Sequence, residues 1–320
     1  MIQLGHSASA SAAEAAQRRR APDADNRVYV DEPTASAARA WAAAEAWPRR
    51  PRGSGRRRRH RAPDRAGGAT LDEAATKAWL ARAGVPLGSL RHLFVTHHHF
   101  DHIGDLYDVM LSSWFEGRKE ALTIHGPPDT KRLVAALQTQ IYDKDIEWRS
   151  DGEPVFGGWA PVHGRDVAPG LVMETPAWRV SADTVVHGHG LAFTPAFLKR
   201  WICYGYRIET QGRVVCVSGD TVDCGGLRRL AQGADVLVQC CYLAEAEITS
   251  EHFRRLAEYT LACGDTVGKI AAACGVKTLV LTHQRPRRDD AMLRALEAEV
   301  RRDFRGELVL ASDLDGVQVG

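Results

Sequence analysis

The chain has 320 residues and a formal net charge of only +2, from 42 Lys and Arg against 40 Asp and Glu. This length suits one large α/β domain with a substantial core, and the near-neutral balance gives no whole-chain sign of a nucleic-acid partner. No apolar run approaches the roughly 20 residues of a membrane span, so no membrane partner is expected. The seven cysteines include no Cys-x-x-Cys pair. Buried free thiols in a reducing, cytoplasmic setting are therefore expected.

The first part of the chain, residues 1–66, differs in composition from the rest. Between Leu4 and Leu71 there is no Leu, Ile, Phe or Met, and Ala, Arg, Pro and Ser dominate instead. Such a segment has too few apolar side chains to offset the entropy of folding, so we predict low-complexity, disordered chain here. The remaining residues, 67–320, are predicted to form one α/β domain.

The richest pattern follows a short apolar segment at residues 93–95, which predicts a buried strand after a helix at 71–83. The candidate metal ligands that follow this strand are His97, His99, Asp101 and His102. Alternate residues of an extended chain point the same way, so the first two ligands can face one ion. The last two lie past the bend and can face a second ion. Imidazole and carboxylate together suit zinc, and also iron or manganese.

A His-rich run also has an ordinary explanation, because a lone histidine is usually structural and a histidine tract can be a tag or a loose loop. This run is internal, follows a strand, includes Asp101 and leads into Gly104. These features favour a built metal site.

Further along the chain, strands and helices alternate. Helices are predicted over 105–115 and 131–142, with a strand from residue 122 between them. Residues 143–170 are rich in Gly, Pro and Trp, which predicts a long irregular segment of the kind that covers an active site. From residue 178 the alternation resumes and continues to closing strands at 307–319. This order of elements suits a layered αββα sandwich.

In this downstream region, apolar strands that end in a polar residue occur three more times. A strand-end Asp is often a cap or turn residue, and a strand-end His is more often an ordinary surface histidine. Four such sites in one chain are much harder to explain as coincidence, so we expect them to surround one metal centre. The strand-like runs 214–217, 278–281 and the less regular 178–186 are followed, in that order, by Asp220, His283 and His187.

Together these motifs resemble those of the metallo-β-lactamase-fold hydrolases, through the His97 run, Ser218–Thr221 (Ser-Gly-Asp-Thr) and the Leu-Thr-His that ends at His283. The segment Tyr204–Thr210, Tyr-Gly-Tyr-Arg-Ile-Glu-Thr, resembles the ribonuclease Z and phosphodiesterase branch. The resemblance covers roughly residues 67–320. It implies a four-layer αββα hydrolase domain, and the fold alone does not specify a substrate.

The resemblance also implies two divalent metal ions, most simply Zn²⁺, with Mn²⁺ or Fe as alternatives. Two such ions a few ångströms apart would share a hydroxide that attacks an ester, and Asp101 would orient it. For the third histidine ligand, His189 and His163 stay open as alternatives to His187. The implied ligands are His97, His99 and His187 for one ion and Asp101, His102 and His283 for the other, with Asp220 bridging.

The chain departs from the ribonuclease Z pattern in two places. Tyr259 stands where that branch has a proton-donating histidine, and a tyrosine, with an ordinary pKa of about 10, is less suited to that role. A packing role for Tyr259 is the equal alternative. The branch's tRNA-gripping arm would lie between residues 210 and 213, where the sequence predicts a tight hairpin turn. Hydrolysis of a substrate smaller than tRNA is therefore expected.

The first functional hypothesis is thus a dinuclear hydrolase of an ester, most simply a phosphodiester, with a small-molecule substrate. The alternatives are a ribonuclease Z-type tRNA 3′ endonuclease, a lactonase or aryl sulfatase, and an inactive metal-binding product of a damaged gene. A nucleic-acid partner is less favoured. The resemblance also implies a homodimer, because members of the family often are dimers.

The resemblance gives residues 1–66 a second meaning, because this fold normally opens with strands there. Only residues 1–5 and 67–70 look like remnants of them. Three explanations stay open: a basic tail that binds nucleic acid or acidic surfaces, a transit peptide, or a reading frame disturbed upstream of the catalytic region. We favour the disturbed frame. Source DNA with no alternative frame encoding Val- and Leu-rich strands would contradict it.

Overall fold

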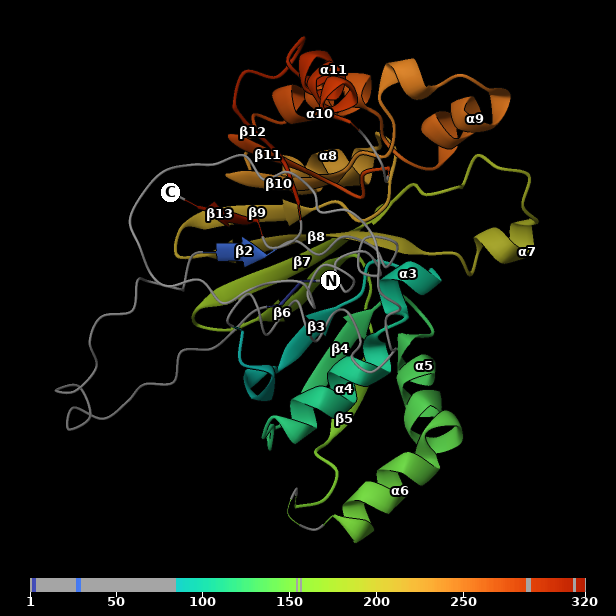
Figure 1. Ribbon diagram of the computed structural model, residues 1–320, viewed down its shortest axis with the longest axis vertical. Coiled ribbons are helices and arrows are strands. Elements are labelled where there is room, and N and C mark those ends of the chain that lie inside the picture. Colours follow the sequence, from blue (N-terminus) through green and yellow to red (C-terminus); the bar gives the residue numbers. More distant parts are fainter. Residues whose placement is uncertain are drawn as a thin grey trace, which may run out of the picture.

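The computed structural model describes residues 2–3, 27–29, 85–153, 155, 157–285, 289–312 and 315–319. Two sheets lie face to face, with helices on both outer sides (Figure 1). This is the four-layer αββα sandwich that the sequence predicts. The helix expected at 71–83 lies outside the described residues. No helix in the described part of the chain is long and apolar enough to cross a membrane.

The smaller sheet has four strands and carries the first ligand run. Three of its strands run parallel, and the two-residue edge strand is antiparallel to its neighbour. Helices α4 (Leu106–Phe115) and α5 (Thr130–Ala136) lie over its outer face, and α6 (Asp143–Gly152) continues from a five-residue π-helical turn (Figure 1). The strands in spatial order are β1 (Ile2–Gln3), β3 (His92–Phe94), β4 (Leu122–Gly126) and β5 (Val162–Asp166).

The larger sheet has seven strands. Strands β9, β10, β11 and β12 run parallel to one another, whereas β6 to β9 form an antiparallel meander. Its strands in spatial order are β12 (Glu307–Leu310), β11 (Thr278–Thr282), β10 (Val236–Cys240), β9 (Arg213–Val217), β8 (Cys203–Thr210), β7 (Trp178–Val185) and β6 (Gly170–Glu174). Most of the helices that follow lie over its outer face: α8 (Gly225–Ala231), α9 (Glu251–Tyr259), α10 (Gly264–Ala273) and α11 (Asp290–Val300) (Figure 1). Two four-residue helices, α3 (Phe100–Ile103) and α7 (Pro195–Leu198), and short 3-10 turns at Leu87–Ser89 and Glu245–Glu247 complete the described helical elements.

The core has three apolar layers, and successive side chains of one strand pack into different layers. On β3, Phe94 packs between the two sheets, whereas its neighbours Leu93 and Val95 pack toward α4. On β11, Val280 packs between the sheets and Leu279 packs toward the outer helices. Successive strand residues point to opposite faces, so a sheet covered on both faces needs a continuous apolar run. This is why both strands could be recognised in the sequence.

The connection between β8 and β9 is the tight turn that the sequence predicts. Thr210 pairs with Arg213, and only Gln211 and Gly212 lie between them, with φ angles of 49° and 71°. Positive φ at both central residues is the type I′ geometry, whose twist matches that of the flanking strands. No arm is inserted at this point.

The expectation of an irregular segment over 143–170 is wrong, because α6 and β5 lie within it. Helix α6 is mostly polar, so it lacks the apolar periodicity by which helices are recognised. Ion pairs one turn apart contribute to it instead, since Arg149 contacts Asp145 at 2.9 Å and Glu153 at 3.4 Å. Of the residues that suggested a long loop, Gly157, Gly158, Trp159 and Pro161 lie in the connection between α6 and β5.

Two short pieces of the segment 1–66 pair with strands of the domain. Strand β1 is antiparallel to β3, and β2 (Arg27–Tyr29) is antiparallel to β13 (Gly316–Gln318). The remainder of the segment and the boundary near residue 67 lie outside the described residues. Its disorder and its reading frame therefore stay predictions.

Candidate metal centre

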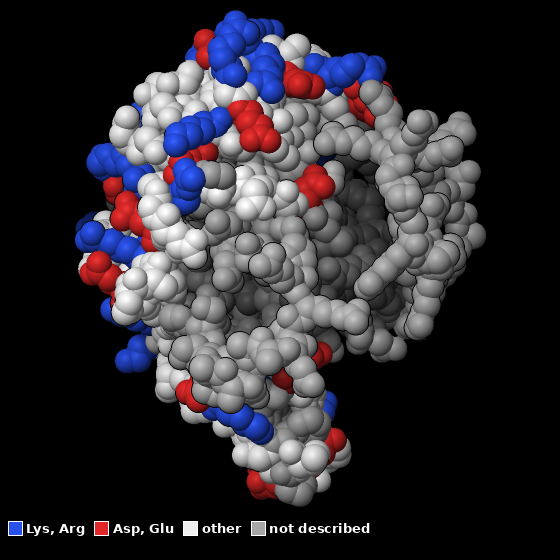
Figure 2. Space-filling view, turned by 90° about the vertical axis from the view of Figure 1, so that its left-hand side faces the viewer, with Lys and Arg blue, Asp and Glu red and all other residues white. Residues whose placement is uncertain are grey.

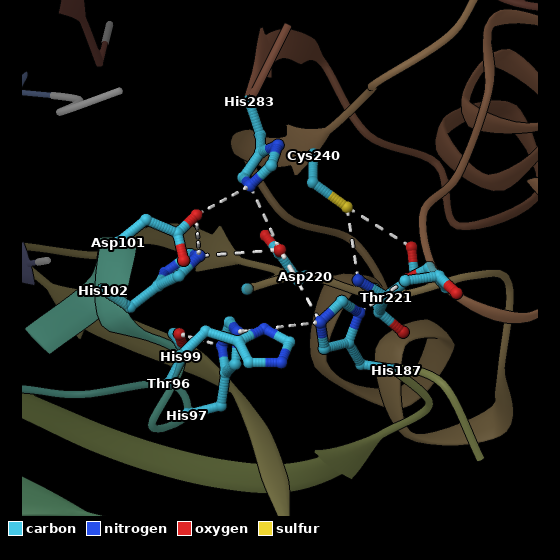
Figure 3. A network of polar contacts seen from close by, with 12 residues as sticks. Thr96, His97, His99, Asp101, His102, His187, Asp220, Thr221, Cys240 and His283 are labelled. Carbon is cyan, nitrogen blue, oxygen red and sulfur yellow. Dashed lines mark hydrogen bonds and ion pairs between the residues drawn. The ribbon is translucent and has the colours of Figure 1, made fainter. Parts of the chain in front are cut away.

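The seven residues expected as ligands converge at one edge of the sandwich (Figure 3). Strands β7, β9 and β11 run in the same direction, so their carboxyl ends meet at one edge of the larger sheet and β3 ends beside them. Three groups have ligand atoms within 4.8 Å of one another: His97 with His99 and His187, His97 with His102 and Asp220, and Asp101 with His102 and His283. The first and third groups are the two sets that the sequence analysis assigned to separate ions.

The first group is a cluster of imidazole nitrogens aimed at one point. His99 Nδ1 lies 3.0 Å from His97 Nε2 and 3.1 Å from His187 Nε2. Burial lowers the pKa of all three rings, and lowers that of His97 well below its usual range. The rings are therefore neutral near pH 7, with lone pairs available to a cation. Three such nitrogens are a donor set of the kind that zinc takes.

The Asp220 carboxylate lies between the two groups. Its Oδ2 is 3.1 Å from His283 Nε2, 3.5 Å from His102 Nε2 and 3.8 Å from His187 Nε2. Burial acts to raise the pKa of Asp220, but the adjacent His283 and His102 outweigh it and hold that pKa well below its usual range. Asp220 is thus a buried anion in contact with both groups.

In the second group, Asp101, His102 and His283, the nearby carboxylates favour a positive charge. Burial alone would lower the pKa of His283, but Asp220 and Asp101 raise it to about 10. His102 Nε2 is buried and makes no hydrogen bond within the described residues, although carboxylate oxygens of Asp101 and Asp220 each lie 3.5 Å away. Two clustered carboxylates and an unsatisfied imidazole nitrogen fit a divalent cation, which would satisfy both.

Groups behind the ligands fix how the rings point. His187 Nδ1 lies 2.7 Å from the Thr260 carbonyl oxygen and donates to it, so Nε2 is left facing His99. His97 Nδ1 lies 3.1 Å from Thr96 Oγ1, which likewise leaves Nε2 toward the centre. Partners of this kind set the tautomer and orientation of metal-binding histidines. Sequence reasoning missed the Thr260 contact, because it joins residues 73 positions apart through a backbone atom.

Backbone geometry places two of the three candidate ligands from the larger sheet, His283 and Asp220. His283 has a φ of 54°, an uncommon conformation for a non-glycine residue, which ends β11 abruptly beside the centre. Gly219 has a φ of 61°, and a Cβ there would lie 2.8 Å from the Tyr204 carbonyl oxygen and 3.0 Å from Thr96 Cβ. The Asp220 turn can therefore pack beneath the ligand run only with glycine at 219.

Thr221 ties the Asp220 turn to the chain before His187. Its buried hydroxyl accepts from the Val186 N–H at 3.1 Å and contacts the Val186 carbonyl at 3.1 Å. Its own N–H donates to Cys240 Sγ at 3.2 Å. Burial raises the pKa of the Cys240 thiol to about 12, so this sulfur is a neutral packing group rather than a thiolate ligand.

The two alternatives for the third histidine are placed differently from His187. His189 Nδ1 accepts from the His187 N–H at 3.1 Å, so its Nε2 carries the proton and donates to the Trp201 carbonyl at 3.1 Å. Both its nitrogens are thereby occupied. His163 is exposed on β5. The geometry supports His187 as the ligand.

Tyr259 packs against the segment that follows His187. A Cβ on Gly190 would lie 2.1 Å from Tyr259 Cδ1, so the ring fills the space above that glycine. The Tyr259 carbonyl accepts from the Gly188 N–H at 2.6 Å. A hydrogen bond with Glu258 raises the pKa of the Tyr259 hydroxyl. These contacts support the packing role, and a role as proton donor stays a prediction.

Comparison with known proteins gives relatives along most of the chain. Residues 71–284 match the family described as the β-lactamase superfamily domain. Ribonuclease Z of Mycolicibacterium paratuberculosis is 32% identical over 273 residues, which cover 80% of this chain and 93% of the relative. Ribonuclease Z of Mycobacterium bovis is 30% identical over 275 residues, with the same shares covered.

Solved structures agree on the fold. The metallo-β-lactamase fold protein YhfI of Bacillus subtilis superimposes with a TM-score of 0.56 at 18% identity, over 77% of this chain and 84% of its own. The short form of human tRNase Z gives a TM-score of 0.51 at 19% identity, over 78% and 86%. The chain therefore belongs to the β-lactamase superfamily, among the metallo-β-lactamase-fold, metal-dependent hydrolases related to ribonuclease Z.

Proposed function

We propose that this protein is a dinuclear metal-dependent phosphodiesterase whose substrate is smaller than tRNA. The observation that carries the proposal is the position of Asp220 Oδ2, within 3.8 Å of His187 from one group and of His102 and His283 from the other. A carboxylate shared in this way suits two adjacent cations better than one.

The residues divide into two binding sets. Bound divalent cations supply Lewis acidity to the attacking water and to the oxygens of the substrate. The imidazole and carboxylate donors favour Zn²⁺, with Mn²⁺ or Fe as alternatives. His97, His99 and His187 would hold one ion and Asp101, His102 and His283 the other, with Asp220 shared by both.

The two carboxylates have different parts in the reaction. Asp220 is 5% exposed and stays anionic between the imidazoles, so it holds the site together. Asp101 is 20% exposed at the open side, with Oδ2 3.6 Å from His283 Nε2 and 3.5 Å from His102 Nε2. This position supports a role for Asp101 in orienting the attacking water and accepting its proton.

One observation supports a substrate smaller than tRNA. The β8–β9 turn holds only Gln211 and Gly212, so no arm extends there. On the face drawn in Figure 2, which points away from α3 and α7, basic side chains are interspersed with acidic ones, in line with the near-neutral net charge. Ribonuclease Z activity is the second candidate, favoured by relatives of that name that align over 93% of their length.

We also propose a cellular compartment, a domain range and an oligomeric state for this enzyme. All seven cysteines are free and six of them are buried, which supports a reducing, cytoplasmic environment. We propose residues 67–320 as the hydrolase domain, working as a homodimer on a small phosphodiester or ester.

The test is hydrolysis of bis(p-nitrophenyl) phosphate by wild type, Asp220→Ala and the control Asp223→Ala, whose carboxylate pairs with Arg228 at the surface. We expect turnover by wild type and by the control, and loss of at least a hundredfold in Asp220→Ala. Preferential cleavage of a precursor tRNA would instead support the second candidate. Turnover only of lactones or aryl sulfates would overturn the phosphodiester assignment.

A further inference from the structure

Three aromatic side chains between His187 and β8 form a row that begins at the metal centre. The Trp201 ring lies 4.6 Å from the His99 ring, centroid to centroid. The Phe197 ring stacks on Trp201 at 5.7 Å, with 15° between the ring planes, and the Phe193 ring lies 4.8 Å from Phe197. We call Phe193, Phe197 and Trp201 the aromatic row. Phe197 belongs to the short helix α7 (Pro195–Leu198), which lies on the same side of the molecule as α3 (Phe100–Ile103) (Figure 1).

The row is fixed to the metal-binding residues. Trp201 Nε1 donates to the His187 carbonyl at 2.9 Å. His189 joins the two ends of the segment through the His187 N–H and the Trp201 carbonyl. The Phe193 ring would lie 3.5 Å from a Cβ at Gly188, so it sits close to the backbone beside His187. The position of the rings is therefore set relative to the reacting centre.

The outer rings of the row are open to solvent. Phe193 is 43% exposed and Phe197 is 38% exposed. The Phe197 ring contacts Trp201, and the Phe193 ring contacts Phe197. Lys199 and Arg200 are exposed on the same segment. Planar rings beside cations are the combination with which proteins bind nucleotides, because bases stack on the rings and phosphates meet the cations.

From these contacts we infer that the aromatic row is a stacking subsite for the nucleobase adjacent to the scissile phosphodiester. Lys199 and Arg200, exposed on the same segment, would meet a flanking phosphate. This inference rests on the proposed phosphodiesterase activity and narrows it to nucleotide substrates. A base stacked on Phe197 would have the Trp201 ring between it and the His99 ring, because Trp201 contacts both rings.

Two substrates with the same leaving group test the inference: thymidine 5′-(p-nitrophenyl) phosphate and methyl p-nitrophenyl phosphate. Loss of one stacking ring costs about 1–3 kcal/mol, so Phe197→Ala should raise KM for the nucleoside substrate about 5- to 150-fold. KM for the methyl substrate should be unchanged. Phe197→Tyr, which keeps a ring, should behave as wild type, and Phe197→Leu as Phe197→Ala. Trp148→Ala, which removes a 62% exposed ring on α6, is the control expected to change neither KM.

Ligand binding gives a readout independent of turnover. We expect calorimetric titration to find AMP binding more tightly than ribose 5-phosphate in wild type, and the difference to vanish in Phe197→Ala. Equal affinity for AMP and ribose 5-phosphate in wild type, or equal changes in both KM values in Phe197→Ala, would overturn the inference. If neither phosphodiester is hydrolysed, the proposed function fails, and the AMP titration still decides the stacking subsite.

Discussion

At the residue scale, the ligands depend on hydrogen bonds that hold them from behind. Thr221 bonds the chain before His187 and follows Asp220 directly, so one side chain connects the two binding sets. The Thr260 carbonyl holds His187 in turn. Such partners determine metal affinity nearly as strongly as the ligands do.

Replacement of Thr221 by valine tests that connection. The change keeps the volume but leaves the Val186 N–H without its partner, so unfolding free energy should fall by about 1–3 kcal/mol. Metal affinity should fall about 10- to 100-fold. Urea denaturation of the metal-free protein and competition with a chelating dye measure the two effects. Thr266→Val, half-buried on α10 with its hydroxyl on the neighbouring Asp265, should leave metal affinity unchanged. Unchanged metal affinity in Thr221→Val would show that the threonine does not position the ligands.

Substitution of Tyr259 separates its two roles. Because the ring packs on Gly190 and the hydroxyl faces Glu258, Tyr259→Phe should retain kcat within about twofold. Tyr259→Ala should lower both stability and kcat, since the segment after His187 loses its support. A fall of about 10²-fold or more in kcat for Tyr259→Phe would identify the hydroxyl as a proton donor.

At the element scale, the strands that could be predicted are those buried on both faces. Residues 278–281 and 214–217 are continuous apolar runs, and the residues that follow them carry the ligands. Strand β5 was missed because Val162 is its only buried residue and the rest of it is polar. The candidate ligands and their convergence were predictable from local spacing. Their positioning by Thr221 and Thr260 was not, because it depends on contacts between distant segments.

The β8–β9 hairpin offers a prediction at the same scale. Gln211 adopts a φ of 49°, which asparagine tolerates better than glutamine does. Gln211→Asn should therefore stabilise the protein by about 0.5 kcal/mol in urea denaturation, with unchanged activity. Gln211→Val is the opposing control, because a β-branched residue resists positive φ, and should be less stable than wild type. If Gln211→Val were the more stable, the type I′ assignment would be wrong.

At the scale of the whole molecule, the space between the sheets encloses a histidine that has no part in the metal centre. His125 on β4 is 1% exposed and stacks on Phe94, with ring centroids 4.8 Å apart. Its Nε2 lies 3.2 Å from His92 Nδ1. Burial, and then the nearby His92 and Arg165, lower the pKa of His125 to about 4.

This shift predicts acid sensitivity of a defined sign. Between pH 6.5, the ordinary histidine pKa, and about pH 4, the unfolded chain binds a proton at His125 that the folded chain excludes. Unfolding free energy should thus fall as pH falls through this window, by up to about 3 kcal/mol from this group. In His125→Gln that portion of the pH dependence should disappear, whereas His252→Gln, exposed on α9, should keep it. Equal slopes in wild type and His125→Gln would contradict the assignment.

The proposed dinuclear centre holds two cations in groups that share Asp220, and metal stoichiometry by native mass spectrometry tests this most directly. We predict about two ions per wild-type chain, about one in His187→Ala and in His283→Ala, and weakened binding of both in Asp220→Ala. His189→Ala and His163→Ala should retain both ions. A single ion in wild type, or two tightly held ions in Asp220→Ala, would contradict the dinuclear centre.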